Sequence, residues 1–276
     1  MRSFWTRFLG NRAGVIAGAY VLALILVMLV VGLVPGPDPN AITPEVMRAP
    51  SIEHPLGTDE LGRDVLISIA HGIKVSLSVG FAAALGATAI GILVGSMAGF
   101  FGGAIDLIFM RVSEIFQVVP SFILAAVIVA LSGPGLLQVV VVISLLAWPQ
   151  VARLMRGEVM RVKQLEFVDA VRCLGVRETA ILTGEVIPNA LAPSVAAGTL
   201  VVAQAILLEA ALSFFGLSSV DIVSWGRMLN SGQRFLFNAW WLSVFPGAAI
   251  FLTVLAFNLL GAALGSALNP RTPSGK

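Results

Sequence analysis

Charged residues are scarce in this chain: they make up 12% of its 276 residues, against about a quarter in an average soluble domain. There is also a single cysteine, Cys173, so an intrachain disulfide is impossible. These shortages exclude a disulfide scaffold, and 58% hydrophobic residues exclude a disordered chain. With a mean hydropathy of +0.96, a water-soluble domain would expose large apolar patches and aggregate.

Motifs for nucleotide, metal and covalent chemistry are missing as well. The phosphate-loop pattern Gly-x-x-x-x-Gly-Lys-Ser/Thr does not occur, so we expect no ATP site of the usual kind in this chain. His54 and His71 are the only histidines, and no Cys/His cluster suggests a metal. No Gly-x-Ser-x-Gly elbow surrounds a serine, and the basic residues do not gather as a nucleic-acid-binding face requires. We therefore expect no enzyme activity, no cofactor and no nucleic-acid partner for this chain.

Long apolar runs are what the chain has in abundance, enough for about six membrane helices of about 20–25 residues each. The first run, 13–34, is longer than the apolar core of a signal peptide and lacks a cleavage site, so we expect it to be retained. The predicted fold class is therefore all-α integral membrane with six transmembrane helices. The other five expected spans are 75–101, 107–131, 136–154, 191–215 and 241–264.

The placement of the basic residues orients these spans. With the amino end inside, twelve of the 17 Lys and Arg fall on the inner side and five on the outer side, as the positive-inside rule demands. The expected plan has a cytoplasmic segment 1–12, a first transmembrane helix 13–34, an outer segment 35–74, a five-helix core 75–266 with a cytoplasmic loop 153–190, and a cytoplasmic tail 267–276.

One face of the second span consists of small residues. Ala83, Ala87, Gly91, Gly95 and Gly99 recur every four residues, which places them on one stripe of a helix. Such stripes let the backbone of a second helix approach closely. We expect another span to pack along this face.

The inner loop 153–190 is large for a compact six-span protein. Its stretch 163–174 is typical of an amphipathic helix, with Val168 among the residues of a broad apolar face. Gly175 follows at the position where glycine ends helices, and a second short helix is expected from 178 until Pro188 stops it. A helix–glycine–helix of this kind lies on the bilayer surface, docks into a partner protein, or packs as an ordinary loop.

Four polar or helix-breaking residues are candidates for a pathway or gate. Glu209 lies inside the fifth span, where a charge costs roughly 2.5–3.5 kcal/mol. It either lines the pathway or, as we favour, is hydrogen-bonded to a neighbouring helix. Glu114 and Gln117 precede Pro120, which should kink the third span and free backbone carbonyls. A packed kink is favoured over a pathway role there.

The polar stretch 54–64 dominates the outer segment. Its residues Asp59, Arg63 and Asp64 suit capping turns over the bundle, and they are also candidates for a contact with a partner outside the membrane. Arg227, in a later outer stretch, is a further candidate contact. A structural role is the favoured interpretation of 54–64.

Six residues of the inner loop follow a spaced pattern: Asp169-Ala170-Val171, then Gly175, then Ile187-Pro188. They resemble the EAA loop of ABC importer permeases, which reads Glu-Ala-Ala, three residues, Gly, nine residues, Ile, one residue, Leu-Pro. The spacing from the glycine to the proline matches in full. The chain departs from this pattern at four positions: Asp169 replaces Glu, Val171 replaces the second Ala, Glu185 replaces Ile and Ile187 replaces Leu.

Two further stretches strengthen the resemblance. HPLGTDELGRD at 54–64, and LLEAALSFFGL at 207–217 followed by SWG at 224–226, are similar to the C-type subunit of the dipeptide/oligopeptide/nickel permease family. Order, spacing and the number of spans agree over about 1–270. The resemblance implies the fold of a type I ABC importer permease.

The resemblance also implies a function, namely a permease subunit that takes up di- or oligopeptides by alternating access in the bacterial plasma (inner) membrane. The implied partners are a homologous second permease subunit in a heterodimer, two ATP-binding subunits that hold ATP and Mg, an extracytoplasmic substrate-binding protein, and membrane lipid. The apolar face of the loop helix would fill a groove on an ATP-binding subunit. The contact residues would be Glu166, Asp169, Ala170, Val171, Gly175, Ile187 and Pro188.

Other functions stay open at this point. Members of the same family take up nickel chelates, glutathione or opines, and the sequence holds no feature that selects among these cargoes. An ion-gradient-driven secondary transporter is the alternative of another class, although only Glu209 lies deep in a span and no inverted repeat is visible. A membrane assembly subunit without transport activity is the third alternative.

Overall fold

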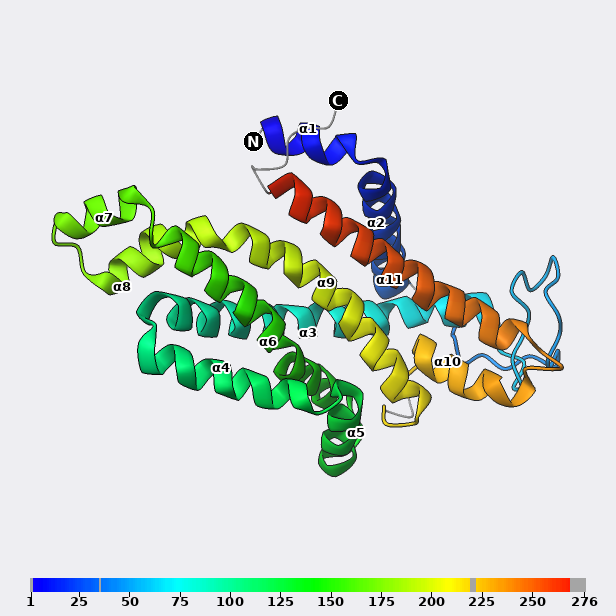
Figure 1. The fold of residues 1–276 in the computed structure, drawn as a ribbon. Coiled ribbons are helices and arrows are strands. Elements are labelled where there is room, and N and C mark those ends of the chain that lie inside the picture. The colour runs from blue at the N-terminus through cyan, green and yellow to red at the C-terminus, as the bar shows by residue number, and fades with distance from the viewer. Residues whose placement is uncertain (1, 35, 219–221, 269–276) are drawn as a thin grey trace.

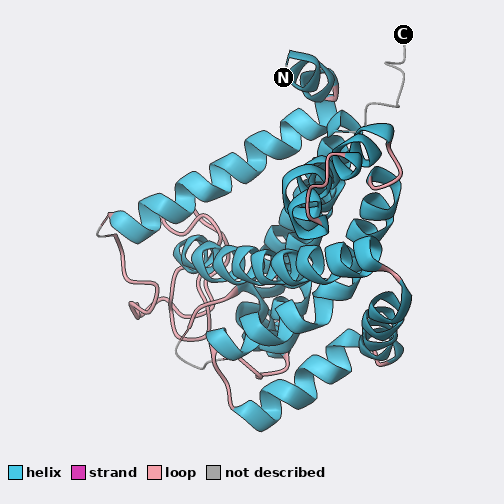
Figure 2. Cartoon of the chain, turned by 90° about the vertical axis from the view of Figure 1, so that its left-hand side faces the viewer, coloured by secondary structure: helices cyan, strands magenta, loops and turns pink. Residues whose placement is uncertain are grey.

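The computed structural model is a bundle of helices without a strand among the residues that it describes, which are 2–34, 36–218 and 222–268 (Figure 1; Figure 2). The predicted all-α class is therefore confirmed. Most of the tail expected at 267–276 lies outside the described residues.

Among the described residues, five helices are long and apolar enough to cross a membrane: α2 (Arg12–Leu33), α3 (Val65–Phe101), α6 (Leu136–Val162), the joined segment Glu178–Phe214 and α11 (Trp241–Leu268). A sixth crossing results if α4 (Gly103–Val118) and α5 (Ser121–Ser132), which meet at 87°, form one span. The joined segment consists of α8 (Glu178–Ile181), the π-helix η1 (Leu182–Val186) and α9 (Ile187–Phe214). The remaining elements are α1 (Arg2–Gly10), α7 (Glu166–Cys173), α10 (Trp225–Gly232) and the 3-10 helix η2 (Gln233–Phe235).

The third expected span is broken rather than kinked. Val119 has φ −88° and ψ 133°, an extended conformation that residues before proline favour, and Pro120 opens α5. Since proline lacks an N–H and its ring clashes with the preceding turn, the helix ends before it. The expectation of one bent helix over 107–131 is corrected to two helices at 87°.

α3 begins at Val65, before the expected start of the second span at 75. The cause is Asp64, whose side chain accepts hydrogen bonds from the N–H groups of Leu66 at 2.8 Å and Ile67 at 3.1 Å. An aspartate at this position satisfies N–H groups that have no partner within the helix, so the helix can start in the aqueous layer. The outer segment is shorter than expected for this reason.

The stripe of small residues on α3 packs against α6, which confirms the expected close approach. A Cβ added at Gly91 would lie 2.5 Å from the Cβ of Val151, and one at Gly99 would lie 2.7 Å from the carbonyl oxygen of Arg156. At Gly95 it would collide with the backbone carbonyl of α6. Only glycine therefore permits this separation of the two helices.

The two ends of the bundle carry different structures (Figure 1). α7 and α8 project at one end, beyond the carboxyl end of α6, whereas α10 and the outer segment lie at the opposite end. α2 stands beside α11 on one flank, where Gly14 faces Ala263. The candidate sites therefore fall into two separate groups.

Candidate functional site

α7 is anchored to the bundle by Val168, its one fully buried side chain (Figure 1). Val168 packs in a cluster with Val159 and Val162 from the last turns of α6 and with Ile181 and Val186 from the segment that follows. The expectation that the apolar face as a whole would fill a partner's groove is therefore wrong for Val168. Its own chain already covers this side chain.

Most of the remaining α7 surface is open. Glu166, Asp169 and Ala170 are exposed, and Val171 is half-buried against the same apolar cluster. Leu174 follows directly after α7 and is 81% exposed. A short fixed helix with two exposed acidic residues, followed by an exposed leucine, presents a surface that suits a partner protein.

Arg172 ties α7 to α8. Its guanidinium donates to Asp169 Oδ1 at 2.7 Å and to Glu178 Oε1 at 2.8 Å. The hydrogen bond to Glu178 is the largest cause that raises the pKa of Arg172 above its ordinary value. These side chains are largely exposed, so the ion pairs of Arg172 orient α7 relative to α8 but add little to the stability of the fold. Gly175 makes the turn between the two helices with φ +77°, a conformation that favours glycine.

Pro188 does not end a helix, contrary to the prediction from sequence. It occupies the first turn of α9, where the missing N–H of a proline is not needed. The π-helical turn η1 leads directly into this position. Ile187 is half-buried against the cluster around Val168, whereas Pro188 is exposed. The α8 end of the loop thus continues into α9 without a break in the helix.

Basic side chains bind the helix ends beneath α7 to one another. Lys163 donates from Nζ to the carbonyl oxygens of Gly99 at 2.8 Å and Phe100 at 3.2 Å, which are among the unpaired carbonyls at the end of α3. Arg156 of α6 makes two hydrogen bonds of 2.5 Å with the carboxylate of Asp106 in the first turn of α4. α7 therefore rests on a base to which α3, α4 and α6 are all joined.

Glu114, Gln117 and Pro120 lie on an exposed stretch around the break between α4 and α5. Glu114 accepts a hydrogen bond from Arg111 at 2.9 Å, one turn earlier on the same helix. Gln117 accepts one from Arg153 of α6. These two side chains thus have partners on the surface of this chain.

A hollow of about 420 Å³ lies beside this break, between α5, α6 and α9. Its wall is mostly apolar, but Gln150, Gln204 and Ser121 also line it. Neither glutamine was among the residues predicted from the sequence. The available signal was a polar amide in the middle of an apolar span, which usually faces a cavity or a protein partner.

Glu209 is fully buried in α9. Its carboxyl group accepts hydrogen bonds from Ser76 of α3 at 3.2 Å and from Ser213 of α9 at 2.7 Å. Hydrogen bonds of this kind offset the free energy that burial of a carboxyl group costs. The arrangement is that of a carboxyl group bonded to a neighbouring helix.

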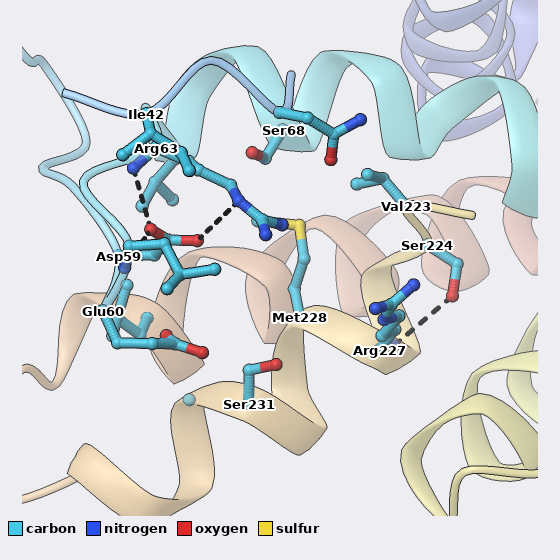
Figure 3. Close-up of a pocket in the computed structure, with 15 residues that line it drawn as sticks. Ile42, Asp59, Glu60, Arg63, Ser68, Val223, Ser224, Arg227, Met228 and Ser231 are labelled. Atoms are coloured by element: carbon cyan, nitrogen blue, oxygen red, sulfur yellow. Dashed lines mark hydrogen bonds and ion pairs between the residues drawn. The ribbon is translucent and has the colours of Figure 1, made fainter. Parts of the chain in front are cut away.

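At the opposite end, Asp59, Arg63 and Arg227 line one cavity of about 620 Å³ between the outer segment, α3 and α10 (Figure 3). Asp59 accepts two hydrogen bonds from nearby backbone N–H groups and lies 4.0 Å from the Arg63 guanidinium. Asp64 serves elsewhere, because it caps α3 and contacts His54 at 2.8 Å. The structure brings three of the four outer candidates together.

At least five of the described helices are long and apolar enough to cross a membrane, and a broken helix pair lies beside a hollow. These are features of a multi-pass membrane protein. The family model for the binding-protein-dependent transport system inner membrane component matches residues 91–273, and the chain belongs to this family. It is a permease component of an ABC importer, as the resemblance predicted.

Curated relatives extend over most of the chain. The dipeptide transport system permease protein DppC of Alkalihalophilus pseudofirmus is 38% identical over 83% of this chain and 75% of its own length. DppC of Bacillus subtilis is 37% identical over 97% of this chain and 84% of its own length. The glutathione transport system permease protein GsiD of Pectobacterium atrosepticum is 36% identical over 99% of this chain and 92% of its own length.

Solved structures of the MetNI methionine ABC transporter in inward-facing conformations share the fold. Two of them match with TM-scores of 0.58 and 0.60 at 19% and 18% identity. They cover 72% and 74% of this chain, and 94% and 97% of the respective neighbour chains. The predicted type I importer fold is confirmed by this match.

Proposed function

We propose that this chain imports di- and oligopeptides as one of two paired, homologous permease subunits in a bacterial inner membrane. The observation that carries the choice of cargo is the pair of relatives named for dipeptide transport, which are 38% and 37% identical to this chain. Two ATP-binding subunits would hold ATP and Mg, and a separate binding protein would deliver the peptide.

The α7 segment is the proposed contact with an ATP-binding subunit. Its support is a division between two sides: Val168 holds the helix on the bundle, while Glu166, Asp169, Ala170 and the neighbouring Leu174 stay open to a partner. ATP binding would favour one of two conformations through the contacts that differ between them. The movement would pass through the base of α7 and directly into α9, and so open the pathway outward.

The α7 end is the proposed cytoplasmic end, together with both termini. Twelve of the 17 Lys and Arg lie on this side in the expected topology, which supports the orientation. The binding protein would then dock at the opposite end, on the outer segment and α10. Its candidate contacts remain Asp59, Arg63, Asp64 and Arg227.

The hollow beside the α4–α5 break is the proposed stretch of the peptide pathway, closed by the second permease subunit. Non-helical backbone at membrane depth is tolerated where it is buried in protein or lines a water-filled cavity, and Ser121, directly after Pro120 at the break, lines this hollow. The amide groups of Gln150 and Gln204 can donate to and accept from a peptide backbone whatever its side chains are. Glu114 and Gln117 lie nearby on α4, whereas Glu209 would act from within the bundle by bonding α9 to α3.

Glutathione is a second candidate cargo, because the relative named for its transport covers 99% of this chain. Glutathione is itself a tripeptide, so the same pathway amides would suit its backbone. Competition between a labelled dipeptide and glutathione in one uptake assay separates the two cargoes.

The test is uptake into proteoliposomes that hold the chain together with its co-expressed subunits and binding protein. We expect dipeptide uptake to require ATP and to fall strongly in Gly175→Asp, since a side chain at φ +77° strains the turn after α7. Gly32→Ala is the matched control, because Gly32 lies in α2 with open space around it. Uptake that persists without ATP but stops with an uncoupler would instead identify an ion-driven transporter.

A further inference from the structure

Two charged side chains of the outer cavity each have one atom without a hydrogen-bond partner among the described residues (Figure 3). The two atoms are Nε of Arg63 and Oε2 of Glu60, and both are buried from solvent. Arg63 Nε lies 4.0 Å from Asp59 Oδ2, which is an ion-pair distance but too long for a hydrogen bond. Both side chains belong to the cavity lining, so a ligand with complementary charges would gain charge-assisted hydrogen bonds there.

The walls of the cavity carry both signs of charge. Arg63 comes from the outer segment and Arg227 from α10, and in Figure 3 the Arg63 side chain reaches toward Met228. Asp59 and Glu60 belong to the same lining, so the four charged side chains sum to zero. Asp59 already accepts two backbone hydrogen bonds, which leaves Glu60 as the free carboxylate.

Apolar surface completes the cavity. Ile42, Val65, Met228 and Leu242 line it beside the charged groups. Its volume of about 620 Å³ falls within the range of small-molecule sites, about 300–1,000 Å³. A few convergent polar groups on an apolar wall are the usual composition of such sites.

We propose that this cavity is a binding site for a small zwitterion with an apolar side chain, of the size of a free amino acid or a dipeptide. Its carboxylate would pair with Arg63 and Arg227, and its ammonium group with Glu60. Because the lining is neutral overall, a purely anionic or purely cationic ligand would leave one sign of charge without a partner. The site shares no lining residue with the hollow at Gln150 and Gln204, so it goes beyond the pathway proposed above. It shares Asp59, Arg63 and Arg227 with the proposed binding-protein contacts, so a docked binding protein would face the same cavity.

Ligand capping tests the proposal without any substitution. The chain, purified with its co-assembled subunits in lipid nanodiscs and kept free of ATP, is titrated with alanyl-leucine by isothermal calorimetry. N-acetylation removes the ammonium group and C-amidation removes the carboxylate. We expect each cap to weaken binding about tenfold or more, because each removes a charge-assisted contact. No binding of the free dipeptide, or equal binding of the capped forms, overturns the proposal.

Matched variants assign each charge to its partner. Glu60→Gln should weaken binding of the free dipeptide but leave binding of the acetylated dipeptide unchanged. Arg63→Gln should also weaken binding of the free dipeptide, but it should leave binding of the amidated dipeptide unchanged. Glu53→Gln is the control, since Glu53 is an exposed acid of the same segment that pairs with Arg48 outside the cavity. Equal effects of Glu60→Gln and Glu53→Gln overturn the proposal.

These experiments distinguish a failure of the outer-site proposal from a failure of the import proposal. If the dipeptide binds as expected but ATP-driven peptide uptake is absent, the import proposal is wrong and the outer site stands. If uptake proceeds while the caps and variants leave binding unchanged, the outer site is wrong and the import proposal stands.

Discussion

Val168→Ala should loosen α7 from the bundle while leaving its exposed surface intact. Val168 is fully buried, and the substitution removes two buried carbon atoms. At about 0.8 kcal/mol for each buried carbon, with a contribution from the cavity left behind, the loss is about 1.5–3 kcal/mol. α7 has 8 residues, too few for a helix to be stable without packing. The loss therefore falls on the docking of α7 rather than on global stability.

Hydrogen exchange of the backbone amides in 166–175 measures this docking directly. Since about 1.4 kcal/mol corresponds to a factor of ten, exchange in Val168→Ala should be about ten to a hundred times faster than in the unchanged chain. ATP-dependent uptake should fall with it, because a loose helix transmits less of the movement of its partner. The amides of α3 and α6 should exchange as before.

Leu174→Ala is the matched control on the open side. Leu174 is 81% exposed, so its removal should leave exchange in 166–175 unchanged while it weakens the proposed contact with an ATP-binding subunit. Equal exchange in the two variants would refute the assignment of Val168 as the anchor. Faster exchange in Val168→Ala with undiminished uptake would refute the role of α7 in coupling.

Three further outcomes follow from other contacts. Gly91→Ala should lower the thermal unfolding midpoint in nanodiscs by overpacking α3 against α6, a loss of about 1–3 kcal/mol, whereas Gly157→Ala in open space should be neutral or stabilising. Glu209→Gln should retain uptake within about twofold, because glutamine keeps one hydrogen-bond acceptor for the two serines. Glu209→Leu should destabilise the protein by about 1–3 kcal/mol, because leucine removes both acceptors. Loss of uptake in Glu209→Gln alone would instead indicate that Glu209 is a gate. A hydrogen bond from Arg48 lowers the pKa of Glu45, so this pair should persist from pH 8 to pH 5 and be lost only as pH falls below about 4.3, as a carboxyl NMR titration would show.

Local signals in the sequence predicted the features that depend on a few neighbouring residues. The four-residue spacing of Gly91, Gly95 and Gly99 predicted the close helix contact, because the shape of one helix face suffices for it. Gly175 at the end of an amphipathic stretch likewise predicted the turn after α7. These expectations needed no knowledge of the partner element.

Features that depend on the partner element were not predictable. Whether Val168 faces the bundle or a second protein depends on the positions of Val159 and Ile181, which lie on other elements. Pro188 equally suits the end of one helix or the first turn of the next, and the π-helical turn before it decides between them. Gln150 and Gln204 are far apart in sequence, so only the folded chain shows that they share a hollow.

α9 connects the two ends of the molecule physically. Its first residues lie against the cluster that anchors α7, and further along it Glu209 bonds to Ser76 of α3. Gly226 of α10 faces the backbone of Ala210 so closely that an added Cβ would lie 2.7 Å from its Cα. A displacement of α7 must therefore move α9 together with α3 and α10, or else break buried hydrogen bonds and close contacts. Because breaking them is unfavourable, movement of these helices as one body costs less free energy, and it would link the exposed surface of α7 to the end of the bundle that carries α10.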